Sequence, residues 1–211
     1  MRRLQIITGH YGTGKTEYAV NLALSLAGAD KKLALADLDI VNPYFRAYEQ
    51  AERLREAGIR VIVSSCGGAV DMPAIDPAVL SLFQDKSWSG VIDIGGDPIG
   101  AHVLARFVDE LHAEDFDLLF VVNANRPETH DLEKALASLR GVEAACGQKM
   151  TGLVNNTHLC AQTTAGEILK GAALAHALSE ATGLPVVRCS GALCRRFVNS
   201  WQSPFCLWTY T

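Results

Sequence analysis

The sequence predicts an α/β fold, a doubly wound and mainly parallel sheet flanked by helices. Short apolar runs rich in β-branched residues alternate along the chain with longer segments of helical periodicity, the pattern of such sheets. The run over 116–123 is almost entirely apolar, as expected for a strand that is covered on both faces. A chain of 211 residues is long enough for one such domain and too short for two comfortable ones. We therefore expect a single domain over 1–211.

The expected elements begin and end where the apolar periodicity does. Gly58 stops a charged helix, and Pro127 with the acids Glu128 and Asp131 indicates that another helix opens near residue 125. The segment over 65–73 is too irregular for a strand or a helix. Strands are expected over 4–8, 32–37, 60–64, 90–93, 116–123, 150–154 and 185–188, with a strand or packed tail over 203–211. Helices are expected over about 15–27, 44–57, 101–112, from 125 onward, and over 164–181.

A glycine-rich loop joins the first expected strand to the first expected helix. It fits the phosphate-binding pattern G-x-x-x-x-G-K-[ST] and reads Gly9-His10-Tyr11-Gly12-Thr13-Gly14-Lys15-Thr16. In such a loop the backbone N–H groups face the phosphates, the lysine reaches the β- and γ-phosphates, and the hydroxyl ligates Mg²⁺. The helix dipole adds positive potential. An ordinary glycine turn is the alternative, but strand, loop and helix occur in the required order, so we expect a nucleotide site here.

Acidic residues follow two of the other expected strands. One strand ends in Asp37 and is followed by Asp39. Both carboxylates would then project toward the nucleotide at the ligand edge of the sheet. The alternative is that they form a solvated strand end or a helix cap. A later strand ends in Asp93 and breaks into a Gly-Gly-Asp turn that closes with Asp97. Asp93 is placed to hold Mg²⁺ as a Walker-B carboxylate does, and Asp97 would report the γ-phosphate state, although the same pattern read alone is a turn.

Asparagines follow the expected strand over 150–154, in the run Asn155-Asn156-Thr157-His158. Guanine-specific proteins usually present Asn-Lys-x-Asp, and that Asp is missing here. An asparagine amide can both donate to and accept from adenine. The favoured nucleotide is therefore ATP. The favoured cation is Mg²⁺, as expected from Thr16 and Asp93.

The composition narrows the class of partner. A net charge of -4 argues against general affinity for nucleic acid or anionic lipid. No apolar run approaches the ~18 residues that span a bilayer, and glycines interrupt the first one too early for a secretion signal. The six cysteines contain no C-x-x-C pair, although Cys189 and Cys194 could join a histidine at a metal site. We expect a cytoplasmic protein with protein or small-molecule partners.

Together these segments resemble the MinD/ParA-type ATPases of the SIMIBI class, which are related to the CobQ/CobB domains, the nitrogenase iron protein and dethiobiotin synthetase. In these families an Asp-x-Asp strand end follows the P-loop, and here Asp39 comes 24 residues after Lys15. The resemblance implies that Asp39 orients the attacking water, that Asp37 supports the Mg²⁺ site, and that Asn156 rather than Asn155 reads adenine.

The opening loop departs from the MinD/ParA pattern at one position. Those proteins carry a signature lysine that crosses to the partner's nucleotide in an ATP-sandwich dimer, and His10 stands in its place here. Histidine reaches less far than lysine. The sequence therefore leaves open whether ATP drives formation of a homodimer.

The leading functional hypothesis is a Mg²⁺-dependent ATPase that acts as a nucleotide-driven switch on a protein partner. Its catalytic residues would be Lys15, Asp39 and Asp97. One alternative is an ATP-dependent small-molecule kinase or ligase resembling dethiobiotin synthetase, with substrate in the loop near 66–71. Another is a GTP-dependent metallochaperone, which His10 and the cysteines favour and the missing guanine motif opposes.

Overall fold

The computed structural model describes residues 2–28, 32–39, 50–63, 77–112, 114–190 and 206–207. Its strands are β1 (Leu4–Thr8), β2 (Lys32–Asp37), β3 (Ile59–Val63), β4 (Trp88–Asp93), β5 (Phe116–Val122), β6 (Gly152–Asn155), β7 (Val186–Ser190) and β8 (Cys206–Leu207). Its helices are α1 (Lys15–Leu26), α2 (Ala51–Glu56), α3 (Pro77–Gln84), α4 (Pro98–Ala105), α5 (Val108–His112), α6 (Leu132–Cys146) and α7 (Ala165–Thr182), with a 3-10 turn at Cys160–Gln162.

The strands form one sheet in the order β3-β2-β4-β1-β5-β6-β7-β8, and every pairing between neighbours is parallel. The predicted α/β class, a parallel sheet flanked by helices, is confirmed. Strand β4 lies between β2 and β1, so that Asp93 is in register with Asp37 on one side and with Ile7 on the other. The ends of three strands therefore meet at the edge where the glycine-rich loop begins.

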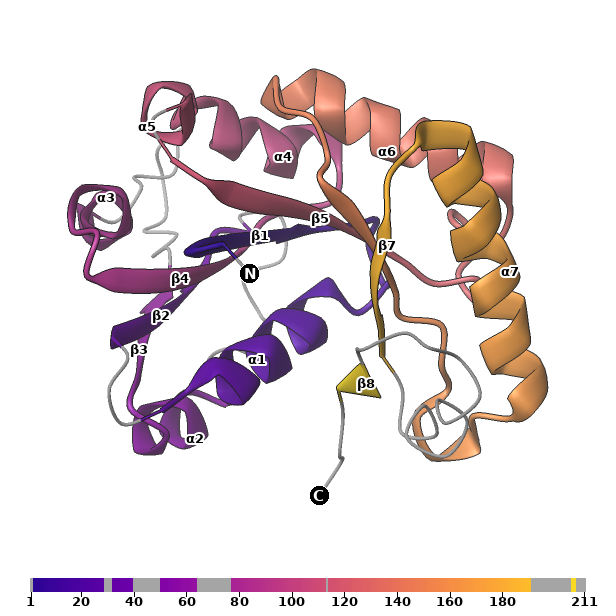
Figure 1. Ribbon diagram of the computed structural model, residues 1–211, viewed down its shortest axis with the longest axis horizontal. Helices are drawn as coiled ribbons and strands as arrows, with labels where there is room; N and C mark the ends of the chain where they lie inside the picture. Colours follow the sequence, from indigo (N-terminus) through magenta and orange to yellow (C-terminus); the bar gives the residue numbers. More distant parts are fainter. Residues whose placement is uncertain are drawn as a thin grey trace, which may run out of the picture.

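Helices cover both faces of this sheet (Figure 1). On one face α1 and α2 bury Tyr18, Leu22 and Leu54 against the strands. On the other face α3 to α7 enclose the larger core, to which Phe120 of β5 belongs. The last five residues of β5 are buried, which accounts for its apolar sequence. This two-sided packing holds the ligand edge of the sheet in a fixed position.

Several helices differ from their predicted bounds. The segment expected as one helix over 101–112 is two, because the chain turns at 106–107 between α4 and α5. Helix α3 was not predicted. Of the helix expected over 44–57, the described part is α2, and residues 40–49 lie outside the described residues.

The helix predicted to open near residue 125 begins seven residues later, at Leu132. Its N-terminal cap is Asp131, whose side chain accepts a hydrogen bond from the Lys134 N–H at 2.9 Å. The preceding residues form a separate turn, because the Asn123 carbonyl accepts hydrogen bonds from the Arg126 N–H at 3.1 Å and from the Thr129 hydroxyl at 2.8 Å. Pro127 and Glu128 therefore lie in a loop between β5 and α6.

Candidate nucleotide-binding site

The glycine-rich loop between β1 and α1 has the closed shape of a phosphate-binding turn. Both the N–H and the hydroxyl of Thr13 donate to the His10 carbonyl, at 3.1 and 2.8 Å. Gly14 has a φ of 85°, and a Cβ atom there would lie 2.3 Å from the Asn156 side-chain nitrogen. Only glycine fits this position, from which α1 starts directly at Lys15. The loop and the helix N-terminus are thus preformed for an anion.

Lys15 is buried at this edge and forms an ion pair with Asp39. Burial alone would lower the pKa of Lys15, but the carboxylates of Asp93, Asp39 and Asp37 outweigh it and raise the pKa. Lys15 is therefore charged at neutral pH. Its charge is compensated by Asp39, the residue expected to orient the attacking water.

Asp93 and Asp37 lie side by side at the ends of β4 and β2. Burial is the largest cause that raises the pKa of Asp93 to about 7, with Lys15 opposing it and Asp37 adding to it. Burial also raises the pKa of Asp37 to about 6. Both oxygens of Asp93 are buried without a hydrogen-bond partner, although the Thr16 hydroxyl lies near enough to lower the pKa slightly. A buried carboxylate in this state lacks a cation or a donor.

These oxygen donors fit Mg²⁺, which is usually held by one or two carboxylates together with substrate phosphates. Asp93 supplies two buried oxygens without partners, and the Thr16 side chain, 7% exposed, stands at the start of α1. Within the described residues no three His, Cys, Asp or Glu side chains gather as a metal site. The arrangement therefore suits a cation that arrives with a phosphate ligand.

The turn after β4 lies directly against the glycine-rich loop. The Ile94 N–H donates to the Ile7 carbonyl at 3.0 Å, and the Thr8 hydroxyl donates to the Gly95 carbonyl at 3.2 Å. A Cβ atom on Gly96 would lie 1.7 Å from the Gly9 carbonyl oxygen. Asp97 caps α4 and accepts from the Gly100 N–H at 2.7 Å. The turn after β4 and the glycine-rich loop are therefore in direct contact.

Asn156 lies beneath the loop rather than in open solvent. Its side chain is 3% exposed and donates to the Thr13 carbonyl at 2.7 Å. Its oxygen accepts from the Ser190 hydroxyl and contacts the His158 ring nitrogen Nε2 at 3.1 Å. Burial is the main cause that lowers the pKa of His158. All these contacts brace the glycine-rich loop against β6 and β7.

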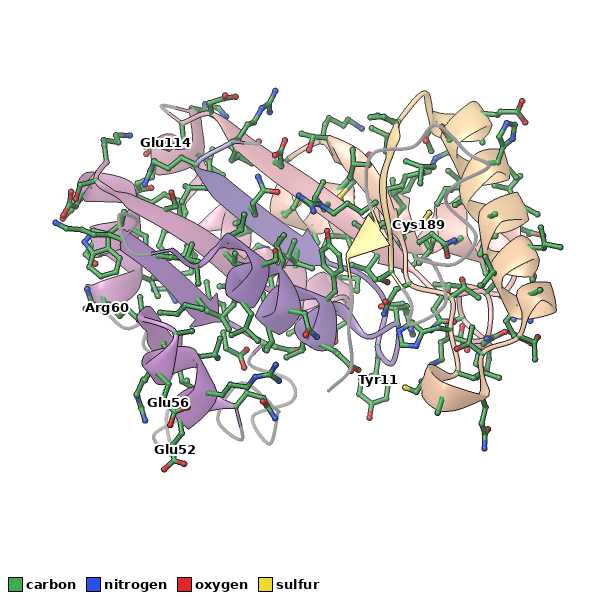
Figure 2. All side chains as sticks on the ribbon, turned by 60° about the horizontal axis from the view of Figure 1, so that its bottom comes forward. Tyr11, Glu52, Glu56, Arg60, Glu114 and Cys189 are labelled. Atoms are coloured by element: carbon green, nitrogen blue, oxygen red, sulfur yellow. The ribbon has the colours of Figure 1, made fainter. Side chains whose placement is uncertain are left out.

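His10 and Tyr11 occupy the outer part of the loop. The His10 ring contacts the Tyr11 carbonyl through Nδ1 at 3.3 Å. The Tyr11 side chain is 71% exposed and projects away from the ribbon (Figure 2).

Of the cysteines considered for a metal, Cys189 contacts the Asn155 amide at 3.9 Å, while Cys194 and the loop over 65–73 lie outside the described residues.

One residue beside the loop was missed by sequence reasoning. The aliphatic part of Arg126, in the loop between β5 and α6, lies 3.7 Å from the position that a Cβ atom on Gly12 would take. The sequence around it, Asn-Arg-Pro-Glu, indicated the start of a helix, and no local pattern indicated that Arg126 lies at the ligand edge of the sheet.

Comparison with known proteins supports the fold without defining a family. No family model and no curated protein matches the sequence. The signal recognition particle receptor FtsY from Elizabethkingia anophelis is 19% identical with a TM-score of 0.52 over 88% of this chain. FtsY from Thermotoga maritima is 21% identical with a TM-score of 0.55 over 87% of this chain. FlhF in complex with GTP and Mg²⁺ is 15% identical with a TM-score of 0.51 over 88% of this chain.

At these identities the likeness shows the fold alone, a parallel sheet flanked by helices. The chain spans only 57 to 64% of the length of these three structures. The expected α/β fold is confirmed, whereas the resemblance to the MinD/ParA-type P-loop ATPases remains a prediction. In the part of the chain that the structure describes, no helix is both long and apolar enough to cross a membrane.

The contact between the two glycine turns can be tested by adding one methyl group. Gly96→Ala places a Cβ atom 1.7 Å from the Gly9 carbonyl oxygen, so the backbone must move. We expect a loss of about 2 kcal/mol in the free energy of unfolding and a fall in Tm of about 6 °C. Gly141→Ala in α6 is the control, because a Cβ atom there meets nothing within 4 Å and alanine favours the helix. Equal melting temperatures for the two variants would contradict the contact.

The buried carboxylate predicts a pH-dependent effect of Asp93→Asn. The folded protein keeps the Asp93 proton up to a pKa of about 7, whereas the unfolded chain loses it near the ordinary value of 3.8. The folded state binds the extra proton between these values, so its stability falls as pH rises through this range. In nucleotide-free protein the Asn variant should gain in Tm over wild type from about pH 4 to 7, and then by a constant amount. Asp115→Asn, on a side chain 78% exposed, is the control. A pH-independent difference for Asp93→Asn would contradict the assignment.

Proposed function

We propose that this chain binds a Mg²⁺-nucleoside triphosphate, with ATP as the nucleotide, at the loop over 9–16 and hydrolyses it as a switch on a protein partner. The observation that carries the proposal is the pair of oxygens on Asp93, buried without a partner beside Lys15 and a preformed phosphate loop. A site with these groups is incomplete until a cation and an anion enter together. A Mg²⁺-bound triphosphate supplies both.

Binding would change the partner of Lys15. Its ammonium group is paired with Asp39 in the structure. Phosphate oxygens entering the loop compete for that ammonium group and meet the N–H groups at the start of α1. The exchange releases the Asp39 carboxylate beside the terminal phosphate. Asp39 can then accept a hydrogen bond from the attacking water and orient it.

Thr16, Asp93 and Asp37 are the residues that would hold the cation, with Asp93 as the most buried of the carboxylates. When bound, Mg²⁺ neutralises charge on the phosphates as the bond to the γ-phosphorus breaks. Binding requires both carboxylates to be ionised. Because their pKa values are raised, cation binding would be coupled to proton release near neutral pH.

The turn over 94–97 is the element that would sense the nucleotide. It packs on the Gly9 carbonyl through Gly96 and leads through Asp97 directly into α4. A terminal phosphate placed between the two turns would alter this contact and move the start of α4. Ile99, 71% exposed in the first turn of α4, would then present a changed surface to a protein partner.

The proposed base is adenine. The missing guanine motif favours ATP, and Asn156 is the expected reader of adenine. Its amide is occupied by Thr13, so reading a base through that group requires the contact to be exchanged. A GTP-driven switch is the second candidate, because FtsY from Elizabethkingia anophelis is known with GDP and FlhF with GTP and Mg²⁺.

Two substitutions separate binding from hydrolysis. Lys15→Ala removes the buried cation and should weaken binding of Mg²⁺-ATP by at least about a hundredfold. Asp39→Asn should retain binding, because Lys15 is freed for the phosphates, and should slow hydrolysis by about a hundredfold. Titration calorimetry and phosphate release measure the two effects. Lys149→Ala, on a side chain 87% exposed, is the control for charge removal. Wild-type turnover in both site variants would refute the proposal.

A nucleotide panel distinguishes ATP from GTP. With Mg²⁺ present, ATP at a hundred times its dissociation constant should stabilise the folded state by about 2.7 kcal/mol. GTP at the same concentration should stabilise it far less. Thermal unfolding and molar mass are measured in the same samples with ATP, ADP and GTP. Stabilisation by GTP alone would replace ATP with the second candidate, and no stabilisation by any nucleotide would refute both.

A further inference from the structure

We propose that Arg126 is a catalytic residue that contacts the nucleotide phosphates from within the same chain. This inference rests on the proposed function and goes beyond it, because it assigns the second positive charge of the site. It implies that the chain completes its own active site without a second copy.

The position of Arg126 places it over the glycine-rich loop. A Cβ atom built on Gly12 would lie 3.7 Å from Cδ and Nε of Arg126 and 3.9 Å from Cζ. A Cβ atom at this position would therefore be in ordinary van der Waals contact with Arg126, which places the end of the arginine side chain beside Gly12. Strand β5, from which its loop departs, is the direct neighbour of β1. The guanidinium is therefore carried to the mouth of the phosphate site by adjacent strands.

The backbone that carries Arg126 is fixed. The Arg126 N–H donates to the Asn123 carbonyl at 3.1 Å, and the Arg126 carbonyl accepts from the Thr129 N–H at 3.0 Å. Asn123 is 4% exposed and Thr129 is fully buried. A third tie comes from the Thr157 hydroxyl, which accepts from the Ala124 N–H at 2.9 Å. The turn thus holds the backbone of one exposed arginine in place beside the glycine-rich loop, a form of preorganisation that favours catalysis.

The guanidinium itself is available. Across the described residues Arg126 forms no ion pair and no side-chain hydrogen bond, and its side chain is exposed. A planar guanidinium presents several donors in the fork geometry that suits phosphate oxygens. An arginine on a fixed backbone, with unused donors beside the glycine-rich loop, is suited to a ligand rather than to structural support.

The charge balance of the site calls for such a group. Lys15 faces the three carboxylates of Asp37, Asp39 and Asp93. His10 stands where the resembling ATPases have a lysine that reaches across a dimer, and its ring contacts the neighbouring Tyr11 carbonyl instead. Arg126 lies against Gly12, two residues beyond His10 in the same loop. Among the described residues we assign Arg126 as the cation that meets the charge that develops as the γ-phosphoryl group leaves the β-phosphate oxygen for water.

The role predicts a loss of rate with little loss of product binding. A positioned arginine contributes about 10³-fold or more to the rate of phosphoryl transfer. Arg126→Ala should therefore lower single-turnover hydrolysis of Mg²⁺-ATP by about a thousandfold, while the dissociation constant for Mg²⁺-ADP changes by less than about threefold. Arg126→Lys should recover part of the rate, and added guanidinium ion should recover part of it in Arg126→Ala. Arg140→Ala, an exposed arginine of α6, is the matched control and should behave as wild type.

Hydrolysis per wild-type chain should also be independent of protein concentration, because no second chain is needed. The assignment is overturned if Arg126→Ala hydrolyses at the wild-type rate, or if it weakens ATP and ADP binding equally without slowing turnover. It is also overturned if the rate per chain rises in proportion to protein concentration. Failure of the wild-type chain to bind any nucleotide would overturn the proposed function together with it. Wild-type hydrolysis with an unaffected Arg126→Ala variant would overturn only the role of Arg126.

Discussion

Three carboxylates and one lysine share a buried edge of the sheet, and this surplus of negative charge constrains everything around it. Lys15 and Asp39 compensate each other, whereas both oxygens of Asp93 are buried without a hydrogen-bond partner, and burial raises the pKa of Asp93 to about 7. Burying an uncompensated carboxylate costs several kcal/mol unless it takes up a proton or a cation. With a pKa of about 7, Asp93 takes up a proton as the pH falls below neutral. The site is thereby held in a state that a cation with its phosphate ligand can relieve.

The rest of the fold supports that edge. Strand β4 inserts between β1 and β2 and brings Asp93 beside Asp37 and the glycine-rich loop. Close contact of Gly96 with the Gly9 carbonyl fixes the distance between the two turns. From the other side, Asn156 holds the Thr13 carbonyl and links the loop to β6 and β7. The helices on both faces of the sheet hold these strands and turns in place.

The parts of this arrangement that are local in the chain could be predicted from sequence. Strand, glycine loop and helix around Lys15 depend on neighbouring residues, and β2 was predicted with its observed bounds. The start of α6 could not be predicted from sequence. Pro127 suggested a helix, but hydrogen bonds to the Asn123 carbonyl hold this segment in a separate turn. The contact of Asn156 with Thr13 joins residues 143 apart, and no local pattern encodes it. The position of Arg126 depends both on the turn at Asn123 and on contacts between residues that are far apart in the chain.

The central claim is that the site takes up a metal and a triphosphate together and gives up protons as it does so. Calorimetric titration of Mg²⁺-ATP in buffers of different ionisation enthalpy counts those protons. The pKa values of Asp93 and Asp37 are raised to about 7 and about 6, so both carboxyl groups carry some protons at about pH 6.5. Binding at this pH should release protons from the wild-type protein and fewer from Asp93→Asn. The difference between the two proteins should shrink at higher pH. Equal proton release from the two proteins, or equally tight binding without Mg²⁺, would contradict the account.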